Sequence, residues 1–162
     1  MATPGKDAVL SQHAANPAVS SLPAWKADAL VDALWDRNEL TLTIARGEIR
    51  EAAQTVQGAG YNFLEDVTAV DWYPSEPRFQ ISYHILSHGM KQRVRLRAFV
   101  PSDDPVIDSI TAVWPSANFY EREVFDLFGV RFAAHPNLRR IMLPDEWEGH
   151  PLRKDYPVEG YR

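Results

Sequence analysis

Four prolines exclude a continuous helix from the C-terminal part of the chain. Pro136, Pro144, Pro151 and Pro157 follow one another at intervals of six to eight residues, and a proline inside a helix removes a hydrogen bond and clashes with the preceding turn. The stretch is nevertheless too apolar for a solvated tail. Its large apolar side chains are Phe132, Leu138, Ile141, Met142, Leu143, Trp147, Leu152 and Tyr156. We therefore expect residues 131–162 to form a long extended segment that wraps a partner protein.

The remainder of the chain predicts an α+β fold. Alternation of apolar and polar residues predicts strands at Glu39–Arg46, Phe63–Trp72, Arg78–Leu86 and Gln92–Val100. Helical periodicity predicts helices at Trp25–Arg37, Ile49–Ala59, Val106–Val113 and Asn118–Phe128. Because the strands are grouped, with helices before and after them, we expect a mainly antiparallel sheet with helices packed on one face. This domain spans residues 25–130, and residues 1–24, rich in Ala, Ser and Pro, are predicted to be a flexible leader.

Composition limits the classes of function that the chain can have. The 162 residues include no cysteine, which excludes disulfides, cysteine-ligated iron–sulfur clusters and cysteine zinc sites. A net charge of −5 argues against a nucleic-acid-binding protein, which is normally basic. No apolar run approaches the roughly 20 residues that cross a bilayer, and the N-terminus lacks the layout of a secretory signal. The sequence predicts a cytoplasmic protein that reaches a membrane only through partners.

One dense set of motifs lies in the C-terminal third. It comprises Glu121-Arg122-Glu123, Asp126-Leu127-Phe128-Gly129, His135-Pro136, Leu138-Arg139-Arg140-Ile141 and the run from Trp147 to Pro157. This pattern resembles the C subunit of proton-pumping NADH:quinone oxidoreductase, bacterial respiratory complex I, a family of 30 kDa-type peripheral-arm subunits. The resemblance is looser over residues 25–115. Related subunits of membrane hydrogenases and of other quinone reductases share much of the pattern, so an equivalent subunit of one of these is the alternative.

The resemblance implies a non-catalytic structural subunit of the respiratory chain. Such a chain would brace the large quinone-site subunit (the D subunit), with the B and I subunits nearby, on the cytoplasmic side of the bacterial inner membrane. It would bind no cofactor itself, while partner subunits carry FMN and the iron–sulfur clusters. The whole complex would transfer electrons from NADH to a quinone such as ubiquinone and pump protons. In this arrangement no electron or proton need pass through the chain.

Two positions depart from the family pattern of Gly-His-Pro-Asp-Leu. This chain has Ala134 and Asn137 where the pattern has glycine and aspartate. An alanine indicates that the backbone there need not adopt a conformation reserved for glycine. Asn137 removes a negative charge, so an aspartate-dependent salt bridge is not expected at this point.

The candidate site residues are predicted to lie at a subunit interface rather than in an active site. Trp and Arg dominate interface energetics, and the planar guanidinium group suits paired contacts with carboxylates on a partner chain. On the helix at 118–128 we expect a capping box between Asn118 and Glu121 and an ion pair between Arg122 and Asp126. The predicted interface set is Glu121, Arg122, Glu123, Asp126, His135, Arg139, Arg140, Trp147, Glu148, His150, Arg153, Lys154, Asp155 and Tyr156.

Three other functions use residues of the same sequence. A small stand-alone acid/base or metal-dependent enzyme would employ Glu123, Asp126, His135 or His150. A metal site drawn from His135, Asp145, Glu148, His150 and Asp155 is disfavoured, because histidines fifteen residues apart on a proline-broken segment share no helix face. Finally, Arg93, Arg95 and Arg97 give one strand a basic face that could bind an anion or RNA, although a solvated sheet face explains it better.

Overall fold

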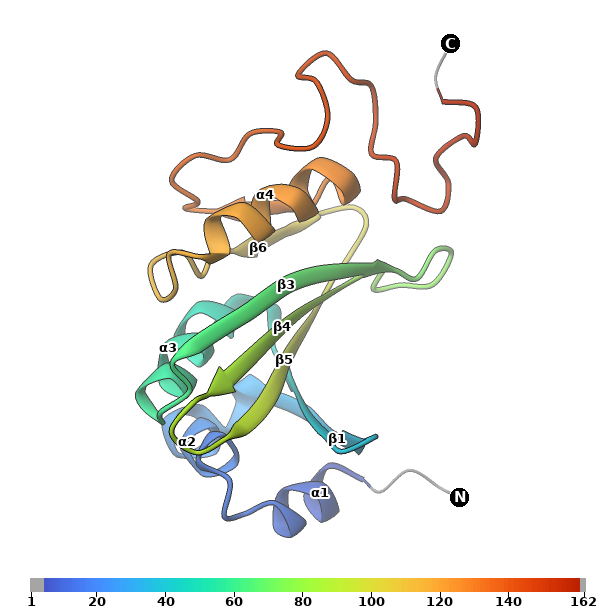
Figure 1. The fold of residues 1–162 in the computed structure, drawn as a ribbon. Coiled ribbons are helices and arrows are strands. Elements are labelled where there is room, and N and C mark those ends of the chain that lie inside the picture. Colours follow the sequence, from blue (N-terminus) through green and yellow to red (C-terminus); the bar gives the residue numbers. More distant parts are fainter. Residues whose placement is uncertain (1–4, 161–162) are drawn as a thin grey trace.

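The computed structural model describes residues 5–160 and contains a five-stranded sheet with helices packed against it (Figure 1). The strands lie in the order β1-β2-β5-β4-β3. They comprise β1 Leu30–Asp36, β2 Glu39–Ile44, β3 Phe63–Asp71, β4 Phe79–Ser87 and β5 Gln92–Val100. All pairs are antiparallel except β2 with β5, which are parallel. The predicted α+β class, with a mainly antiparallel sheet, is confirmed.

One face of the sheet builds the core. Along β4, Phe79, Ile81, Tyr83 and Ile85 are buried and alternate with residues that face the other side, as the period of two in a strand requires. Helix α3 (Ile49–Gly58) contributes a buried stripe to this core. Helix α4 (Ala117–Phe128) runs along β3 and adds its own apolar side (Figure 1). Predicted strands and helices at these places are confirmed to within one or two residues.

The prediction of a flexible leader is wrong for residues 5–24. Helices α1 (Lys6–Gln12) and α2 (Pro17–Lys26) lie here, and Val9, Ala18 and Leu22 are fully buried in the core. Asn16 caps α2, since its Oδ1 accepts a hydrogen bond of 2.9 Å from the N–H of Ala18. Pro17 takes the first helical position, where a proline costs nothing. Residues 1–4 lie outside the described part.

The helix expected at Trp25–Arg37 is also wrong, because β1 occupies most of it. A bulge between Leu30 and Asp32 interrupts the pairing with β2, and the extra residue breaks the alternation that would identify a strand. The turn after β1 is the sequence signal that indicates a strand here. Arg37 and Asn38 both have positive φ, as in the two-residue hairpin turns that favour asparagine.

The helix predicted at Val106–Val113 is replaced by a short strand. Strand β6 (Val106–Asp108) pairs in parallel with β7 (Arg131–Ala133) in a second sheet. Phe132 of β7 is buried in the core of the domain, so the domain extends to residue 133. We call residues 134–160 the C-terminal strap. It has no helix or strand, runs over α4 and then reaches the β3–β4 hairpin (Figure 1).

Within residues 5–160, no helix is long and apolar enough to cross a membrane.

Candidate subunit interface

The C-terminal end of α4 is the main attachment point of the C-terminal strap. The last carbonyl groups of a helix have no partner within it, and here the strap supplies the donors. The Nδ1–H of His150 donates to the carbonyl of Asp126 at 2.8 Å, the N–H of Leu152 to that of Leu127 at 3.1 Å, and the Nε–H of Arg153 to that of Phe128 at 2.6 Å. The cationic Arg153 also suits the negative end of the helix dipole.

Asp126 is fully buried beneath the strap and binds it directly. Its Oδ2 accepts the backbone N–H groups of Ile141, Met142 and Leu143 at 2.9, 2.7 and 3.0 Å. Its Oδ1 accepts from the guanidinium group of Arg140 at 2.6 Å. Burial by itself raises the pKa of the Asp126 carboxyl, but these donors outweigh burial, and the pKa is lowered. The carboxylate therefore stays ionised and holds the strap at this point.

Arg140 extends this attachment into the loop that follows. Its Nη2 donates to the carbonyls of Trp147 and Gly149 at 2.9 and 3.1 Å, so one guanidinium group joins Asp126 to both sides of the loop. Arg122, which is nearly buried on α4, donates to the carbonyls of Arg139 and Arg140 at 3.1 Å each. The backbone around Arg140 is therefore fixed by two arginines and one carboxylate.

Gly129 allows the strap to approach the helix end. It has a φ of 74° in the left-handed region, where glycine is favoured at a helix C-terminus. A Cβ atom at this position would lie 2.5 Å from Cδ2 of His150 and would also meet the Arg153 guanidinium group. Both the conformation and the contact therefore require glycine.

A second attachment point lies at the base of the β3–β4 hairpin. Arg78 forms a paired contact with Asp71, at 2.9 and 2.8 Å, and another with Asp155 of the strap, at 2.9 and 2.6 Å. Asp71 also accepts the backbone N–H of Lys154 at 2.8 Å. Burial opposes ionisation of Asp71, yet its hydrogen bonds with Arg78, Lys154 and Tyr73 lower its pKa to about 2. The Lys154 ammonium lies 6.0 Å from the Trp72 ring.

The strap begins over a buried pair, Glu121 and His135. The side chains are fully buried, with 3.9 Å between His135 Nε2 and Glu121 Oε2. Glu121 accepts from the hydroxyl of Ser109 at 2.6 Å and from the N–H of Ile110 at 2.8 Å. Burial raises its pKa to about 7 in spite of these two donors. Burial likewise lowers the pKa of His135, so its ring is neutral at pH 7 and its Nε2–H donates to the Asn118 carbonyl.

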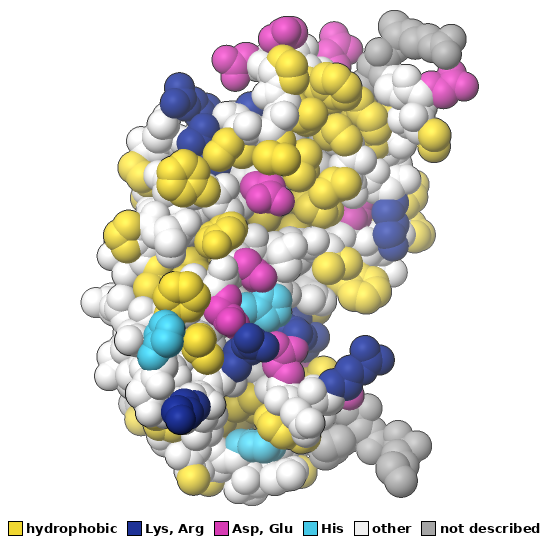
Figure 2. All heavy atoms as spheres, in the orientation of Figure 1, with side chains coloured by type: hydrophobic (Ala, Val, Ile, Leu, Met, Phe, Trp, Pro, Cys, Tyr) yellow, Lys and Arg dark blue, Asp and Glu magenta, His cyan; other side chains and the backbone are white. Residues whose placement is uncertain are grey.

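Large apolar side chains of the strap point away from the domain. Met142 is 63% exposed, Leu152 50% and Trp147 41%. Ile141 and Val158 are also exposed, as are Trp72 and Tyr73 beside the second attachment point. Figure 2 shows hydrophobic side chains gathered over the upper part of the molecule, where Figure 1 places α4 and the strap. The strap is thus attached to the domain by polar groups, while most of its large apolar side chains are exposed and Leu138 packs against the core.

Several predictions about individual residues are wrong in detail. The carboxylate partner expected for Arg140 on another chain lies within this one, because Asp126 pairs with Arg140. No capping box forms, because α4 begins at Ala117 with Ser116 at the cap and Glu121 turned into the core. Within the described residues, Arg122 and Asp126 form no ion pair and bind the strap separately. Ala134 does adopt a left-handed conformation, with a φ of 60°.

The predicted interface residues separate into two groups. Those that are buried beneath the strap or hold it in place are Glu121, Arg122, Asp126, His135, Arg140, His150, Arg153, Asp155 and Tyr156. Those that are exposed are Glu123, Arg139, Trp147, Glu148 and Lys154. Contact of either group with a partner stays a prediction. Asp71 and Arg78 were not predicted, because their role depends on the strap returning to a hairpin about eighty residues earlier.

The residues considered for catalysis, metal binding or anion binding do not form such sites. Asp126 is occupied by four donors, and Glu123 is exposed on the helix surface. His135 and His150 both donate to backbone carbonyls. Among residues 5–160 no group of three or more His, Cys, Asp or Glu side chains is placed to hold a metal ion. On the sheet, Arg93 pairs with Glu65, Arg95 with Glu39 and Arg97 with Asp32, so the arginines of β5 are neutralised within the chain.

The structure thus consists of an α+β domain that holds a proline-rich strap by polar contacts and leaves several of the strap's large apolar side chains exposed. The chain belongs to the family described as "respiratory-chain NADH dehydrogenase, 30 Kd subunit", whose model matches residues 42–162. This confirms the family resemblance of the motifs between Glu121 and Pro157. A component of complex I is by definition part of a multi-subunit assembly.

Relatives match over nearly the whole chain. The C subunit of the NADH-quinone oxidoreductase of Citrifermentans bemidjiense is 47% identical, over 90% of this chain and 91% of its own. The protein of the same name from Geobacter sulfurreducens is 46% identical over similar shares. Among solved structures, a trypsin-resistant fragment of Nqo5 is 36% identical with a TM-score of 0.58, covering 62% of this chain and 83% of the fragment.

A more distant structure shares the fold alone. A chain of the membrane-bound sulfane sulfur reductase, an archaeal respiratory membrane complex, has a TM-score of 0.76 at 22% identity, covering 91% of this chain and 86% of that one.

Proposed function

We propose that this chain is a structural subunit, without an active site or cofactor of its own, in the peripheral arm of a proton-pumping NADH:quinone oxidoreductase. It braces the large quinone-site subunit (the D subunit), with the B and I subunits nearby, on the cytoplasmic side of the bacterial inner membrane. FMN and the iron–sulfur clusters belong to the partner subunits. Relatives at 40–47% identity that are named as the C subunit of this enzyme favour it over a hydrogenase or another quinone reductase.

One observation carries the proposal: the strap is docked but its apolar side chains are not covered. Contacts of Asp126, Arg140 and Arg78 fix its path on the domain, while Met142 and Leu152 are at least half exposed. Because exposed apolar clusters of this kind mark interaction surfaces, and because a prearranged surface loses less conformational entropy on binding, this surface suits a permanent partner.

The bracing role is tested by recovery of the assembled complex. Membranes of the source cell, solubilised in mild detergent, are applied to the tagged full-length chain or to a Met142→Asp/Leu152→Asp variant. The wild type should recover the quinone-site subunit together with flavin and cluster absorbance. The variant should recover at least tenfold less, since burying two carboxylates in an apolar contact costs several kcal/mol.

A matched control separates docking from folding. Val31 on β1 is 57% exposed, so Val31→Asp adds a charge to an exposed apolar position outside the strap. Both sets of variants should melt within a few degrees of the wild-type free chain, because the altered side chains are solvated there. Equal recovery of the partner by the Met142→Asp/Leu152→Asp variant and the wild type would contradict the proposal.

A further inference from the structure

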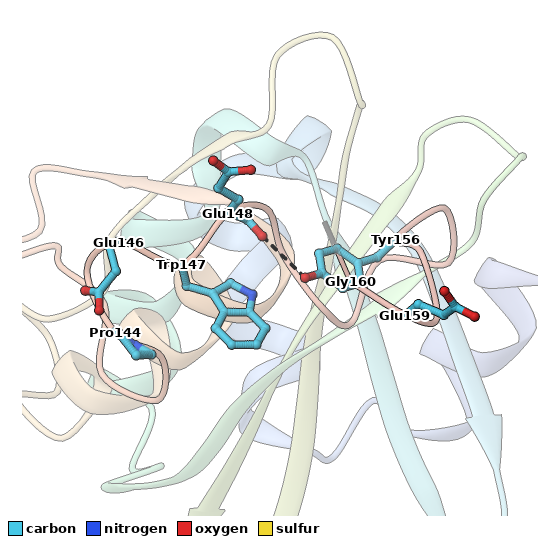
Figure 3. A pocket seen from close by; sticks show the side chains of 7 residues that line it. All are labelled: Pro144, Glu146, Trp147, Glu148, Tyr156, Glu159 and Gly160. Carbon is cyan, nitrogen blue, oxygen red and sulfur yellow. Dashed lines mark hydrogen bonds between the residues drawn. The ribbon is translucent and has the colours of Figure 1, made fainter. Parts of the chain in front are cut away.

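The loop Pro144–Gly149 and the end of the strap form a cleft that has no role in attaching the strap to the domain. It has a volume of about 510 Å³ and is lined by Pro144, Glu146, Trp147, Glu148, Tyr156, Glu159 and Gly160. Figure 3 shows the Trp147 ring on one side and Tyr156 on the other. The Tyr156 hydroxyl donates to the Glu148 carbonyl at 3.4 Å, and Arg140 holds the Trp147 carbonyl, so both aromatic residues are attached to fixed backbone.

Exposed carboxylates of the loop Pro144–Gly149 flank this aromatic cleft. Asp145, Glu146 and Glu148 are exposed, and none of them forms an ion pair with another residue in 5–160. This differs from the attachment points of the strap, where Asp71, Asp126 and Asp155 are all paired with arginines. Figure 3 shows the carboxylates of Glu146 and Glu148 on different sides of the Trp147 backbone, not converging on one point. Divergent carboxylates do not suit a metal ion, which needs several ligands around one centre.

We propose that this cleft receives an arginine or lysine side chain of a partner polypeptide. A cation over the face of a tryptophan is attracted by the ring, and more strongly when the contact is desolvated. The exposed carboxylates around the cleft give it a negative potential that favours a cation. An acidic group would be repelled. Trp147, Met142 and Leu152 are all exposed in the same strap, so the basic side chain would add a charged contact to the proposed interface.

This inference rests on the proposed docking of the strap and specifies the chemistry of its partner. It predicts that the contact contains a salt-sensitive component located at residues 145–148. Removing Trp147 should weaken the contact even when every charge is retained, because the ring supplies the face on which the cation lies.

The experiment uses the full-length chain and its complex. Glu146→Lys/Glu148→Lys and Trp147→Ala are compared with the wild type. Glu51→Lys, which reverses the charge of an exposed glutamate of α3, is the control for charge reversal outside the strap. Recovery of the partner is measured at several salt concentrations. Charge reversal and Trp147→Ala should each lower recovery roughly 30-fold at low salt, the size expected for a central interface residue. Trp147→Phe should lose less, and Glu51→Lys should match the wild type.

A photo-crosslinking amino acid at position 147 then identifies the contacted peptide. A partner peptide with arginine or lysine at the cross-link is the expected result, and changing that basic residue to glutamate should restore recovery by the Glu146→Lys/Glu148→Lys chain.

The outcomes distinguish the two proposals. If the wild-type chain recovers no partner, the docking function itself fails. If the wild type recovers its partner and the charge-reversed chain does so equally at every salt concentration, only the basic-residue cleft is wrong. A cross-link to a second copy of this chain, or to a peptide without a basic residue, would also overturn the cleft assignment.

Discussion

At the residue scale, Asp126 decides whether the strap stays on α4. Four donors from the strap converge on its carboxylate. Asp126→Ala should weaken docking of the strap by about 3 kcal/mol, the usual cost of breaking a buried pair. Trypsin cleavage after Arg139, Arg140 and Arg153 should then be faster by roughly 100-fold, as that free energy implies. The melting temperature of the domain should change little. Glu123→Ala, an exposed glutamate on the same helix, should leave cleavage unchanged.

Glu121 should give the free chain a measurable pH dependence. Its folded pKa of about 7 is above the ordinary 4.5, so the folded state retains a proton that the unfolded state has lost. The free energy of unfolding therefore falls as pH rises from about 4.5 to 7, by about 1–3 kcal/mol. The groups facing this carboxyl are Ser109, Ile110, His135 and, through its charge, Arg50.

Glu121→Gln is the variant that tests this pH dependence. A glutamine retains an acceptor for Ile110 and cannot ionise. Urea unfolding at pH 5 and pH 7.5 should show a smaller decline for the variant, and at pH 7.5 the variant should be at least as stable as the wild type. An unchanged decline would assign the pH dependence to another group.

At the scale of elements, the end of α4 and the strap form one structural unit. Gly129→Ala must place an alanine at a φ of 74° and push aside His150 and Arg153, at a conformational cost of about 1 kcal/mol before any contact is lost. Hydrogen exchange at the Leu152 N–H, which is bonded to the Leu127 carbonyl, should accelerate. Gly58→Ala is the control, because a Cβ there meets nothing within 4 Å. Equal exchange in both variants would contradict this.

Elements with a continuous period were predictable from sequence. Strands β4 and β5 alternate without interruption, β3 alternates after an irregularity between Leu64 and Asp66, and α4 ends at Gly129 where expected. Elements that depend on a distant or irregular partner were not. Strand β1 contains a bulge, and β6 is three residues long and pairs with β7 over twenty residues later. The sequence predicts the apolar strap. It does not predict that Arg140 pairs with Asp126 of the same chain, because residue spacing alone does not show which carboxylate a loop approaches.

At the scale of the whole molecule, the domain should fold without the strap. The buried apolar core ends at Phe132, before the strap begins. A chain truncated after residue 133 should keep its circular dichroism spectrum and cooperative melting. It should also be more soluble than the full chain, because the exposed apolar side chains are gone. Loss of cooperative melting would show that the strap is part of the core.

The central claim is that a partner covers the exposed apolar side of the strap, while polar groups on its other side are already bonded to the domain. Hydroxyl-radical labelling of Met142, Trp147 and Leu152, compared between the free full-length chain and the assembled enzyme, tests it most directly. The account predicts that all three side chains react readily in the free chain, as their exposure requires, and are protected several-fold in the assembly. Equal reactivity in both states would contradict it.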